Sequence, residues 1–294
     1  MKSPFFSVII PTYNRENVIE RCINSVLNQS FKDFEIIIVD NASSDGTIHI
    51  INAIKDARIT LIINEKNYER CYSRNKGISH AKGEYLCFLD SDDFYLQNHL
   101  DYLKRNIDTD DDRYEMYITN KLINNECNNE NKESEFHNYH DLSFFLKHAI
   151  IPARVCIKSN VFEYFKFESK YLIVEDTILW IEIANRFEIR LLKEPTVVYV
   201  IHENNSVNIK FNTSRKRLKG LKLFFKEQRN IAKIIGRRKI NETLNRCYFG
   251  IFEHYKYKNW KFKQFIIILK SLIKFPRYSF KHKLKLLISI FISE

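Results

Sequence analysis

Short apolar runs alternate with amphipathic segments along the first half of the chain. Residues 5–10, 34–39, 59–63 and 85–89 are rich in β-branched and aromatic side chains and predict buried strands. Between the first two runs, apolar side chains recur at the spacing of a helix: Ile19, Cys22, Ile23, Val26 and Leu27. Strands that alternate with helices form parallel βαβ units whose helices cover both faces of a sheet. The pattern therefore predicts an α/β fold.

Polar residues follow three of these predicted strands directly. Pro11 is expected to break the first strand, and Thr12 comes after it. Asp40 follows the second strand and Asp90 follows the fourth. Ligands of open α/β sheets bind beyond the carboxyl ends of the strands. We therefore expect a binding site where these side chains meet.

Three carboxylates fall within four residues after the fourth strand, namely Asp90, Asp92 and Asp93. Like charges this close repel one another, and a divalent cation that bridges carboxylates to substrate phosphates is a common solution. The alternative is an acidic helix N-terminus, in which Asp92 or Asp93 caps a helix that begins near Tyr95. The first interpretation predicts metal-assisted handling of a phosphorylated substrate.

Four motifs in the first hundred residues resemble those of the family 2 glycosyltransferases. They occur in the order and at the separations usual for the family: PTYNR at 11–15, VDNASSDGT at 39–47, SRNKGISHAKGEY at 73–85 and FLDSDD at 88–93. The resemblance is strong over residues 5–105 and recognisable to about 206. It implies an inverting, nucleotide-sugar-dependent enzyme with the GT-A fold, which is Rossmann-like and has a mostly parallel central sheet flanked by helices.

The resemblance implies a nucleotide site built from the loops after the strands. Thr12 and Asp40 stand where such enzymes hold the uracil and ribose of a UDP-sugar, although Asp40 also suits a helix cap. Arg74 stands where a guanidinium pairs with diphosphate oxygens, the alternative being a solvated helix surface. Glu69 stands where family members often carry Gly, which alters the loop before the third helix. The full set of implied nucleotide-binding residues is Pro11, Thr12, Tyr13, Asn14, Asp40, Asn67, Arg74, Asp90 and Ser91.

The resemblance also implies a metal site. Asp90, Ser91 and Asp92 match the family's Asp-x-Asp element, in which Asp92 would ligate Mn²⁺ or Mg²⁺ directly. The cation would neutralise the diphosphate and stabilise it as a leaving group. His202 follows a predicted strand at 197–201 and stands where a His often completes the metal or diphosphate shell. The alternative is a structural His at a strand end.

A second acidic pair, Glu175 and Asp176, precedes an apolar helical segment. The simple interpretation is that both carboxylates occupy the first turn of that helix, where the helix dipole favours them. The resemblance implies more, because the pair matches the family's Glu-Asp element. Inversion needs a base that deprotonates the acceptor hydroxyl on the face opposite the leaving diphosphate. Asp176 is expected to be that general base, with Glu175 as the second choice.

The region between these motifs is expected to recognise the acceptor. Residues 124–134 are polar without apolar periodicity and predict a loop or lid over the site. Arg154 would meet an acceptor phosphate or remain solvated. We expect a nucleotide-sugar-binding half at 1–125, an acceptor-binding and catalytic half at 126–210, and a basic helical region at 211–294.

The whole chain has a net charge of +11, and its positive charge is concentrated in the last part. Residues 210–294 hold 23 Lys and Arg against four Asp and Glu, whereas residues 1–209 hold 24 and 32. Two apolar stripes within 261–291 recur at helical spacing among lysines such as Lys281 and Lys283. Basic amphipathic helices bind anionic membrane surfaces. Packing onto the core or into an oligomer is the alternative, and nucleic-acid binding lacks an accompanying motif.

Two further observations favour a peripheral location at the inner face of the cytoplasmic membrane. No stretch of about 20 uncharged apolar residues exists, and the first residues do not resemble a signal peptide. The six cysteines are scattered without a CxxC pair, and several of them fall on apolar patterns and are expected to be buried free thiols, as in a reducing cytoplasm.

Together these features predict metal-assisted transfer of a hexose from a UDP-sugar to a sugar hydroxyl by a single displacement. The resemblance implies acceptors of bacterial surface-polysaccharide assembly, such as a sugar on polyprenyl diphosphate or an O-antigen or lipopolysaccharide intermediate. A sugar nucleotidyltransferase is one alternative, but it usually needs a Gly-rich basic loop after the first strand, and residues 11–16 contain no Gly. A non-catalytic module that binds nucleotide sugars is the other.

Overall fold

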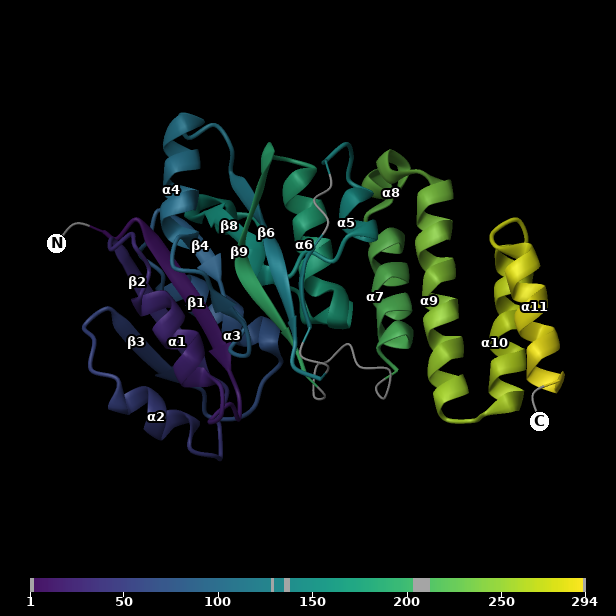
Figure 1. The fold of residues 1–294 in the computed structure, drawn as a ribbon. Helices are drawn as coiled ribbons and strands as arrows, with labels where there is room; N and C mark the ends of the chain where they lie inside the picture. Colours follow the sequence, from purple (N-terminus) through teal and green to yellow (C-terminus); the bar gives the residue numbers. More distant parts are fainter. Residues whose placement is uncertain (1–2, 128–129, 135–137, 203–211, 293–294) are drawn as a thin grey trace. The chain divides into compact units, whose positions relative to one another are not determined.

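The computed structural model describes residues 3–127, 130–134, 138–202 and 212–292 (Figure 1). The chain divides into two compact units. The first comprises Met1–His140, Ala149–Ser169 and Leu179–His202, and the second comprises Asp141–His148, Lys170–Ile178 and Glu203–Glu294. The division falls inside helix α6 (Glu175–Ala184). The boundary predicted between 210 and 211 lies outside the described residues.

A nine-stranded sheet forms the centre of the first unit, in the order β3-β2-β1-β4-β8-β6-β9-β5, with β7 paired to β6. The strands are β1 (Phe6–Thr12), β2 (Phe34–Asp40), β3 (Ile59–Ile63), β4 (Tyr85–Phe88), β5 (Phe94–Tyr95), β6 (Met116–Asn125), β7 (Glu130–Glu133), β8 (Val155–Lys158) and β9 (Ile189–Ile201). From β3 to β4 all pairs are parallel, and beyond β4 the pairing is mixed. The α/β architecture expected from the alternating pattern is therefore confirmed.

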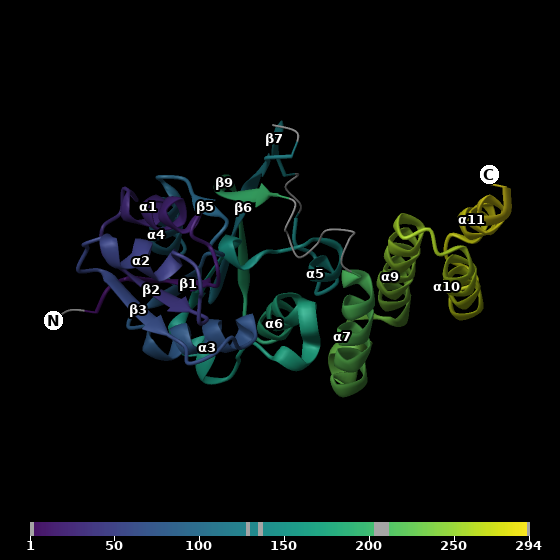
Figure 2. The same ribbon diagram turned by 90° about the horizontal axis from the view of Figure 1, so that it is seen from below.

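Helices cover both faces of the parallel part of the sheet (Figure 2). They are α1 (Ile19–Leu27), α2 (Thr47–Ala53), α3 (Arg70–His80) and α4 (His99–Thr109). Val8 and Ile10 point to one face and share a buried cluster with apolar residues of α1 and α4. Ile9 points to the other face, where a Cβ at Gly77 of α3 would lie 2.4 Å from Ile9 Cγ2. Gly77 therefore allows α3 to pack close to the sheet.

Strand β1 continues through Pro11, so the expectation that Pro11 breaks it is wrong. Pro11 lies opposite Val39 of β2 in the parallel register. Ile9 bonds toward the β4 side, because its carbonyl accepts from Leu89 N at 3.0 Å. Pro11 faces the same side two residues further on, and the ladder with β4 ends at Ile9. The missing N–H therefore costs no ladder hydrogen bond.

The sequence predicted a loop or lid at 124–134, and this prediction is wrong for the residues that the structure describes. These residues belong to a hairpin, in which β6 runs to Asn125 and pairs antiparallel with β7. All four residues of β7 are exposed. Polar side chains on an exposed strand keep their hydration, and the backbone gains the hydrogen bonds of the ladder. Such a strand can therefore form without apolar periodicity in its sequence.

The second unit is helical apart from its loops. Its helices are α5 (Phe144–Lys147), the start of α6, α7 (Thr213–Glu227), α8 (Arg229–Ile235), α9 (Arg237–Tyr257), α10 (Lys261–Lys274) and α11 (Phe280–Ile292). The 3₁₀ segment Ser169–Val174 leads into α6. Both helices expected in the tail are present as α10 and α11. Within the described residues, every helix is too short or too polar to span a bilayer.

One side of the tail helices is packed and another is exposed. Phe252 of α9, Ile268 of α10 and Ile290 of α11 form a buried cluster. Lys283 is also buried, and its Nζ donates to the carbonyl oxygens of Ser271 and Phe275 at 3.1 and 2.7 Å. The expectation that Lys283 is one of the basic residues that flank the apolar stripes for a membrane surface is therefore wrong, because it is buried and caps the C-terminal end of α10.

All six cysteines are free, and five of them are buried as the sequence predicted. Cys127 is the exposed one.

Candidate functional site

The carboxyl ends of β1, β2 and β4 lie side by side in the first unit. Thr12 and Asp40 are the last residues of their strands and are partners in the parallel register. Leu89 continues β4 alongside β1 through its bond to Ile9, and Asp90 follows it. The fold therefore brings Thr12, Asp40 and Asp90 to one edge of the sheet, where ligands of α/β proteins bind.

Asp40 is completely buried and organises the loop that follows β2. Its Oδ2 accepts from Ser43 N at 2.8 Å, and its Oδ1 accepts from Ser43 Oγ at 2.5 Å. Helix α2 begins later, at Thr47, whose N–H donates to Asp45 at 3.0 Å. Asp40 therefore closes a turn and does not cap α2, and the helix-cap alternative is wrong.

The loop after β1 is tied to the loop after β2. Asn14 has a left-handed backbone with φ 49°, a conformation that Asn tolerates better than most residues. Its N–H donates to Ser43 Oγ at 2.9 Å, and its Oδ1 accepts from Ser44 N at 2.9 Å. Tyr13 projects from this braced loop with 40% of its surface exposed. Thr12 Oγ1 is buried and has no hydrogen-bond partner among the described residues, which marks a position for a ligand donor or acceptor.

An asparagine cluster joins the end of β2 to the loop before α3. Asn41 Nδ2 donates to Asn67 Oδ1 at 2.8 Å and to the Tyr68 carbonyl. Tyr68 N donates back to Asn41 Oδ1 at 2.9 Å, and Asn64 Nδ2 donates to the same oxygen at 3.0 Å. Asn67 is thus held by the fold in a loop whose shape Asn41 sets. The sequence indicated Asn67 through the resemblance to the family. It assigned no role to Asn41, although Asn41 lies in the VDNASSDGT motif, and Asn64 lies outside the four motifs.

Arg74 lies inside the first unit with 3% of its side chain exposed, so the solvated alternative is wrong. Its Nη2 donates to Asp90 Oδ1 at 2.6 Å, and its guanidinium lies 5.2 Å from the centre of the Phe167 ring. The neighbouring Asn75 exchanges two hydrogen bonds with the Phe167 backbone, at 2.8 and 3.0 Å. Arg74 therefore holds the Asp90 carboxylate in a fixed orientation at the end of β4.

Asp92 lies close to two cationic or ionisable groups. Its Oδ2 is 3.1 Å from His202 Nε2 and 3.6 Å from Arg15 Nη2. The structure thus brings together Asp92 and His202, which are 110 residues apart in the sequence. The nearness of Arg15 was not foreseen, although it stands at the end of the PTYNR motif. Ser91 between the two aspartates is 6% exposed.

Asp93 has a different environment from its two neighbours. It is 2% exposed, and its Oδ1 accepts from Val200 N of β9 at 2.9 Å. Burial, followed by repulsion from Asp90 and Asp92, raises the pKa of Asp93 well above its usual value. The residues after it form β5, and α4 begins at His99, so no carboxylate of the triplet caps a helix near Tyr95.

The donor set fits a hard divalent cation that is shared with a substrate. Within the ranges that the structure describes, no three His, Cys, Asp or Glu side chains form a metal site by themselves. Asp92 and His202 offer one carboxylate and one imidazole. Cations that assist phosphate chemistry are commonly held by one or two protein carboxylates, with phosphate oxygens and waters as the other ligands. The residues present therefore suit a cation that binds together with a diphosphate.

Two cations outside the sequence motifs belong to this part of the first unit: Lys121 is buried and interacts with Asp93, and Arg154 is half-buried. Burial and the charge of Arg154 lower the pKa of Lys121 to about 8, and Asp93 opposes this shift. Lys121 Nζ lies 4.5 Å from the centre of the Tyr199 ring. Arg154 Nε donates to the Thr119 carbonyl at 2.6 Å, and burial lowers its pKa to about 10. Arg154 is therefore not a solvated side chain.

Glu175 and Asp176 belong to the second unit, at the start of α6. Glu175 is 1% exposed. Asp176 Oδ1 accepts from Thr177 N at 2.5 Å, as expected for a carboxylate in the first turn of a helix. The acidic residues of the first unit, Asp40, Asp90 and Asp92, are not part of this unit.

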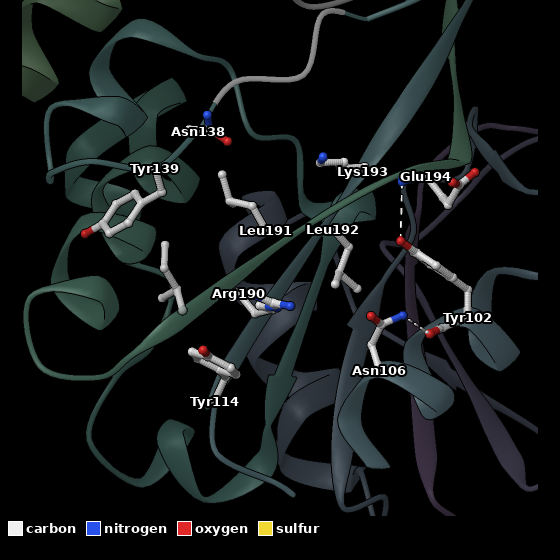
Figure 3. Close-up of a pocket in the computed structure, with 11 residues that line it drawn as sticks. Tyr102, Asn106, Tyr114, Asn138, Tyr139, Arg190, Leu191, Leu192, Lys193 and Glu194 are labelled. Atoms are coloured by element: carbon white, nitrogen blue, oxygen red, sulfur yellow. Dashed lines mark hydrogen bonds between the residues drawn. The ribbon is translucent and has the colours of Figure 1, made fainter. Parts of the chain in front are cut away.

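A cavity of about 600 Å³ lies elsewhere in the first unit (Figure 3). It is bordered by Tyr102 and Asn106 of α4 and by the first half of β9. Asn106 Nδ2 donates to the Tyr102 carbonyl at 2.8 Å, and Tyr102 Oη accepts from Glu194 N at 3.4 Å. The cavity contains none of the residues of the carboxylate edge.

Comparisons with known proteins agree with this geometry. Residues 7–170 match the family model described as glycosyl transferase family 2. An uncharacterized glycosyltransferase of Methanocaldococcus jannaschii is 32% identical over 214 residues, which are 68% of this chain and 72% of that protein. The Escherichia coli UDP-Glc:alpha-D-GlcNAc-diphosphoundecaprenol beta-1,3-glucosyltransferase WfgD is 35% identical over 122 residues, 40% of this chain and 48% of that one.

A Campylobacter jejuni GalNAc(5)-diNAcBac-PP-undecaprenol beta-1,3-glucosyltransferase is 39% identical over 129 residues, 42% of this chain and 40% of its own length. These two bacterial relatives are thus matched over less than half of their length. Among solved structures, Staphylococcus aureus TarS 1-349 in complex with UDP-GlcNAc gives a TM-score of 0.65 at 16% identity, covering 97% of this chain and 90% of that one. The mannosyltransferase PcManGT from Pyrobaculum calidifontis, in complex with GDP-Man and Mn²⁺, gives 0.58 at 15% identity, covering 98% and 86%. These likenesses establish a shared fold.

Proposed function

The chain belongs to glycosyl transferase family 2, and from this premise we propose that it transfers a hexose from a UDP-sugar to a sugar hydroxyl of a lipid-linked or polysaccharide acceptor. The observation that carries the proposal is the carboxylate edge of the first unit. There Asp90 is held by Arg74 and Asp92 lies beside His202, next to the strand end that carries Asp40. This arrangement suits a nucleoside diphosphate with its cation.

The nucleoside would bind across the ends of β1 and β2. The unpartnered Thr12 Oγ1 and the buried Asp40 carboxylate offer hydrogen bonds to a uracil imide and to ribose hydroxyls. The exposed Tyr13 ring offers a flat apolar surface beside them. The uridine donor is supported by the structures of TarS in complex with UDP-GlcNAc and with UDP, and by the UDP-Glc in the name of WfgD.

The diphosphate would bind at the end of β4. Asp92 and His202 would hold Mn²⁺ or Mg²⁺, which neutralises charge on the departing UDP. Arg15, whose Nη2 is 3.6 Å from Asp92, adds positive charge at the same place. Arg74 would orient Asp90, to which its Nη2 donates at 2.6 Å, and its positive charge would support the diphosphate.

Transfer would proceed by one inverting displacement. The acceptor hydroxyl oxygen forms a bond to the anomeric carbon while the bond to the UDP oxygen breaks. The proton of that hydroxyl passes to the carboxylate of Asp176, with Glu175 as the second choice. Partial burial of Asp176 in the first turn of α6 supports this assignment, because a fixed carboxylate is ready to accept a proton.

The acceptor would be attached to a membrane lipid, and the protein would bind the inner face of the cytoplasmic membrane. Support comes from the diphosphoundecaprenol and PP-undecaprenol in two relatives' names. The tail helices α10 and α11 expose several apolar side chains between lysines: Phe262, Leu269, Ile273, Phe280, Leu284 and Ile288. Exposed apolar and basic residues together suit an anionic bilayer surface. On this proposal residues 1–125 bind the nucleotide sugar, 126–210 bind the acceptor and supply the base, and 211–294 form the basic helical region.

The test is transfer of labelled hexose from UDP-glucose, UDP-galactose and their N-acetyl forms to a prenyl-diphosphate-linked sugar. Transfer that needs Mn²⁺ or Mg²⁺, and that falls at least about a hundredfold in Asp92→Asn, supports the proposal. Asp101→Asn on α4 is the matched control, because its half-buried carboxylate forms an ion pair with Arg105 on the same helix and lies outside the carboxylate edge. Formation of UDP-sugar from UTP and a sugar phosphate would instead identify a nucleotidyltransferase, and no turnover of any donor would identify a binding module.

A further inference from the structure

A second cavity, of about 670 Å³, lies within the second unit and is distinct from the carboxylate edge. The residues that line it are Leu172, Asn212, Arg215, Lys216, Leu218, Lys219 and Lys222. Six of the seven belong to α7 or its N-cap, and Leu172 comes from the 3₁₀ segment before α6. The cavity thus has an apolar wall and a cationic rim.

The cationic rim is concentrated on one side of α7. Arg215, Lys219 and Lys222 are spaced as neighbours on a helix surface, and Lys216 lies next to them. Among the residues that the structure describes, none of these four side chains forms an ion pair with an acidic group. Glu227, the acidic residue of α7, is engaged by Lys170 at 3.1 Å. Like charges at this spacing destabilise a helix, so an anion bound between them would remove a cost that the unliganded protein bears.

The opposite wall is held firmly against α7. A Cβ at Gly220 would lie 2.2 Å from the Tyr171 carbonyl oxygen, so only Gly allows this approach. Tyr171 Oη also donates to Glu227 at 2.9 Å. Leu172, next along the chain, has φ 60° and ψ −124°, which is strained for a residue with a branched side chain. Strain of this kind persists where neighbouring contacts impose it, and it is frequent at ligand clamps.

We infer that this cavity binds the phosphate groups of a prenyl-diphosphate-linked acceptor, with Arg215, Lys216, Lys219 and Lys222 around the phosphates and Leu172 and Leu218 against the first isoprene units. Phosphate oxygens take hydrogen bonds from several Lys and Arg side chains at once. The apolar wall selects an anion that carries a hydrocarbon chain over a free phosphate. Leu172 is also four residues before Asp176, so the site and the proposed base belong to one unit. The inference rests on the proposed function and names where the acceptor is held.

The experiment measures binding of farnesyl diphosphate to the full chain by calorimetry, in the presence of saturating UDP and Mn²⁺ to occupy the donor site. The pocket variant is Lys216→Glu with Lys219→Glu. The matched control is Lys226→Glu with Lys233→Glu, which changes the charge equally at exposed positions of α7 and α8 outside the cavity. We expect the pocket variant to lose about tenfold or more in affinity and the control to stay within about twofold.

Two comparisons separate the sources of the signal. Inorganic pyrophosphate should bind wild type at least about tenfold more weakly than farnesyl diphosphate, and Leu172→Asn should narrow this gap. Vesicles of phosphatidylglycerol should bind the pocket variant and the control variant equally. The inference would be overturned if the pocket variant and the control variant lost the same affinity for farnesyl diphosphate. It would also be overturned if the pocket variant lost affinity for the vesicles alone. UDP titration of the same variants reports the donor site separately, so failure there bears on the proposed function and not on this cavity.

Discussion

The carboxylate edge of the first unit and the basic helices of the second unit use charge in opposite ways. At the edge, each acidic side chain has a partner that fixes it: Ser43 for Asp40, Arg74 for Asp90, His202 for Asp92 and the Val200 N–H for Asp93. Along α7, the cations of the cavity rim remain without acidic partners among the described residues. Partnered charges form a rigid site for one small ligand, whereas unpartnered charges suit a ligand or surface that brings its own anions.

The two regions also differ in how far their apolar residues are exposed to solvent. In the sheet, Ile36, Ile38 and Val39 are at most marginally exposed. In the tail, Phe262 and Ile273 expose 76% and 72% of their surface. Burial in the sheet stabilises the fold, whereas the exposed tail residues contribute little until another surface covers them.

The largest effect is expected on the rate of transfer, when the proposed general base in the second unit is replaced. Asp176→Asn should lower kcat about a thousandfold, because general-base catalysis contributes roughly two to four orders of magnitude. The dissociation constant of UDP should stay unchanged, since Asp176 belongs to the other unit from the nucleotide residues. Steady-state transfer assays and UDP titration measure the two quantities. Asp108→Asn, an exposed carboxylate of α4, is the control. A loss of UDP affinity in Asp176→Asn would contradict the assignment.

The second effect concerns stability. Ile38→Ala should lower the free energy of unfolding by about 3 kcal/mol, because it leaves a cavity in a fully buried strand. Ile273→Ala should cost less than about 0.5 kcal/mol, because the side chain is already solvated. Urea unfolding followed by far-ultraviolet circular dichroism reports the helices of both units and measures both costs. The chain has two tryptophans, so in a Trp260→Phe background the buried Trp180 reports the first unit separately by fluorescence. Equal costs for the two substitutions would remove the contrast between the regions.

The third effect is a pH dependence of the first unit. His99 is 1% exposed, its Nδ1 is 2.7 Å from Thr196 Oγ1, and burial lowers its pKa to about 3. The unfolded chain binds a proton near pH 6.5 and the folded chain does not, so stability falls as pH drops below that value. Between pH 7 and 5 the part of the loss that His99 causes should be about 2 kcal/mol. The raised pKa of Asp93 changes stability in the opposite direction, so the His99 part is measured as the difference between wild type and a His99 variant.

Urea unfolding at the two pH values, again followed through Trp180, measures this loss. The change in stability between the two pH values should differ by about 2 kcal/mol between wild type and His99→Gln, whereas substitution of the exposed His80 should leave it as in wild type. The same pH dependence in wild type and His99→Gln would show that His99 does not cause the loss.

The smallest effect is expected at the membrane surface. Replacing Phe262, Phe280 and Ile288 by Ser should weaken binding to vesicles of anionic lipid about tenfold, because these exposed side chains would otherwise enter the bilayer interface. Ile63→Ser with Tyr164→Ser removes exposed apolar residues of the first unit and is the control. Sedimentation with vesicles measures the change. Unchanged binding of the tail variant would favour packing against another protein surface.

The sequence alone predicted the parts that depend on local pattern. Alternating strands and helices placed Thr12, Asp40 and Asp90 at one edge, since parallel strands end on the same side. It could not predict contacts between distant segments without a motif. The Asp93 bond to Val200 joins residues 107 apart, and it changes Asp93 from a candidate helix cap into a buried carboxyl.

Two further errors have the same origin. From the sequence, Lys283 is one of the lysines around a helical apolar stripe. Its hydrogen bonds to the end of α10 depend on the packing of α10 against α11, which the sequence pattern does not indicate. The hairpin at 124–134 lacks apolar periodicity because β7 is exposed on both faces. The cavity beside α7 needs Leu172, more than forty residues away in the chain, and the periodicity of α7 does not indicate it.

We propose that the carboxylate edge binds a nucleoside diphosphate with a divalent cation, independently of the tail. Calorimetric titration with UDP, with and without Mn²⁺, tests it most directly on wild type, Asp92→Asn and the triple Ser variant of the tail. We expect metal-dependent binding of UDP in wild type and in the tail variant, and loss of this binding in Asp92→Asn. Binding of UDP that is indifferent to Mn²⁺ and to Asp92, or binding of GDP or dTDP in place of UDP, would contradict it.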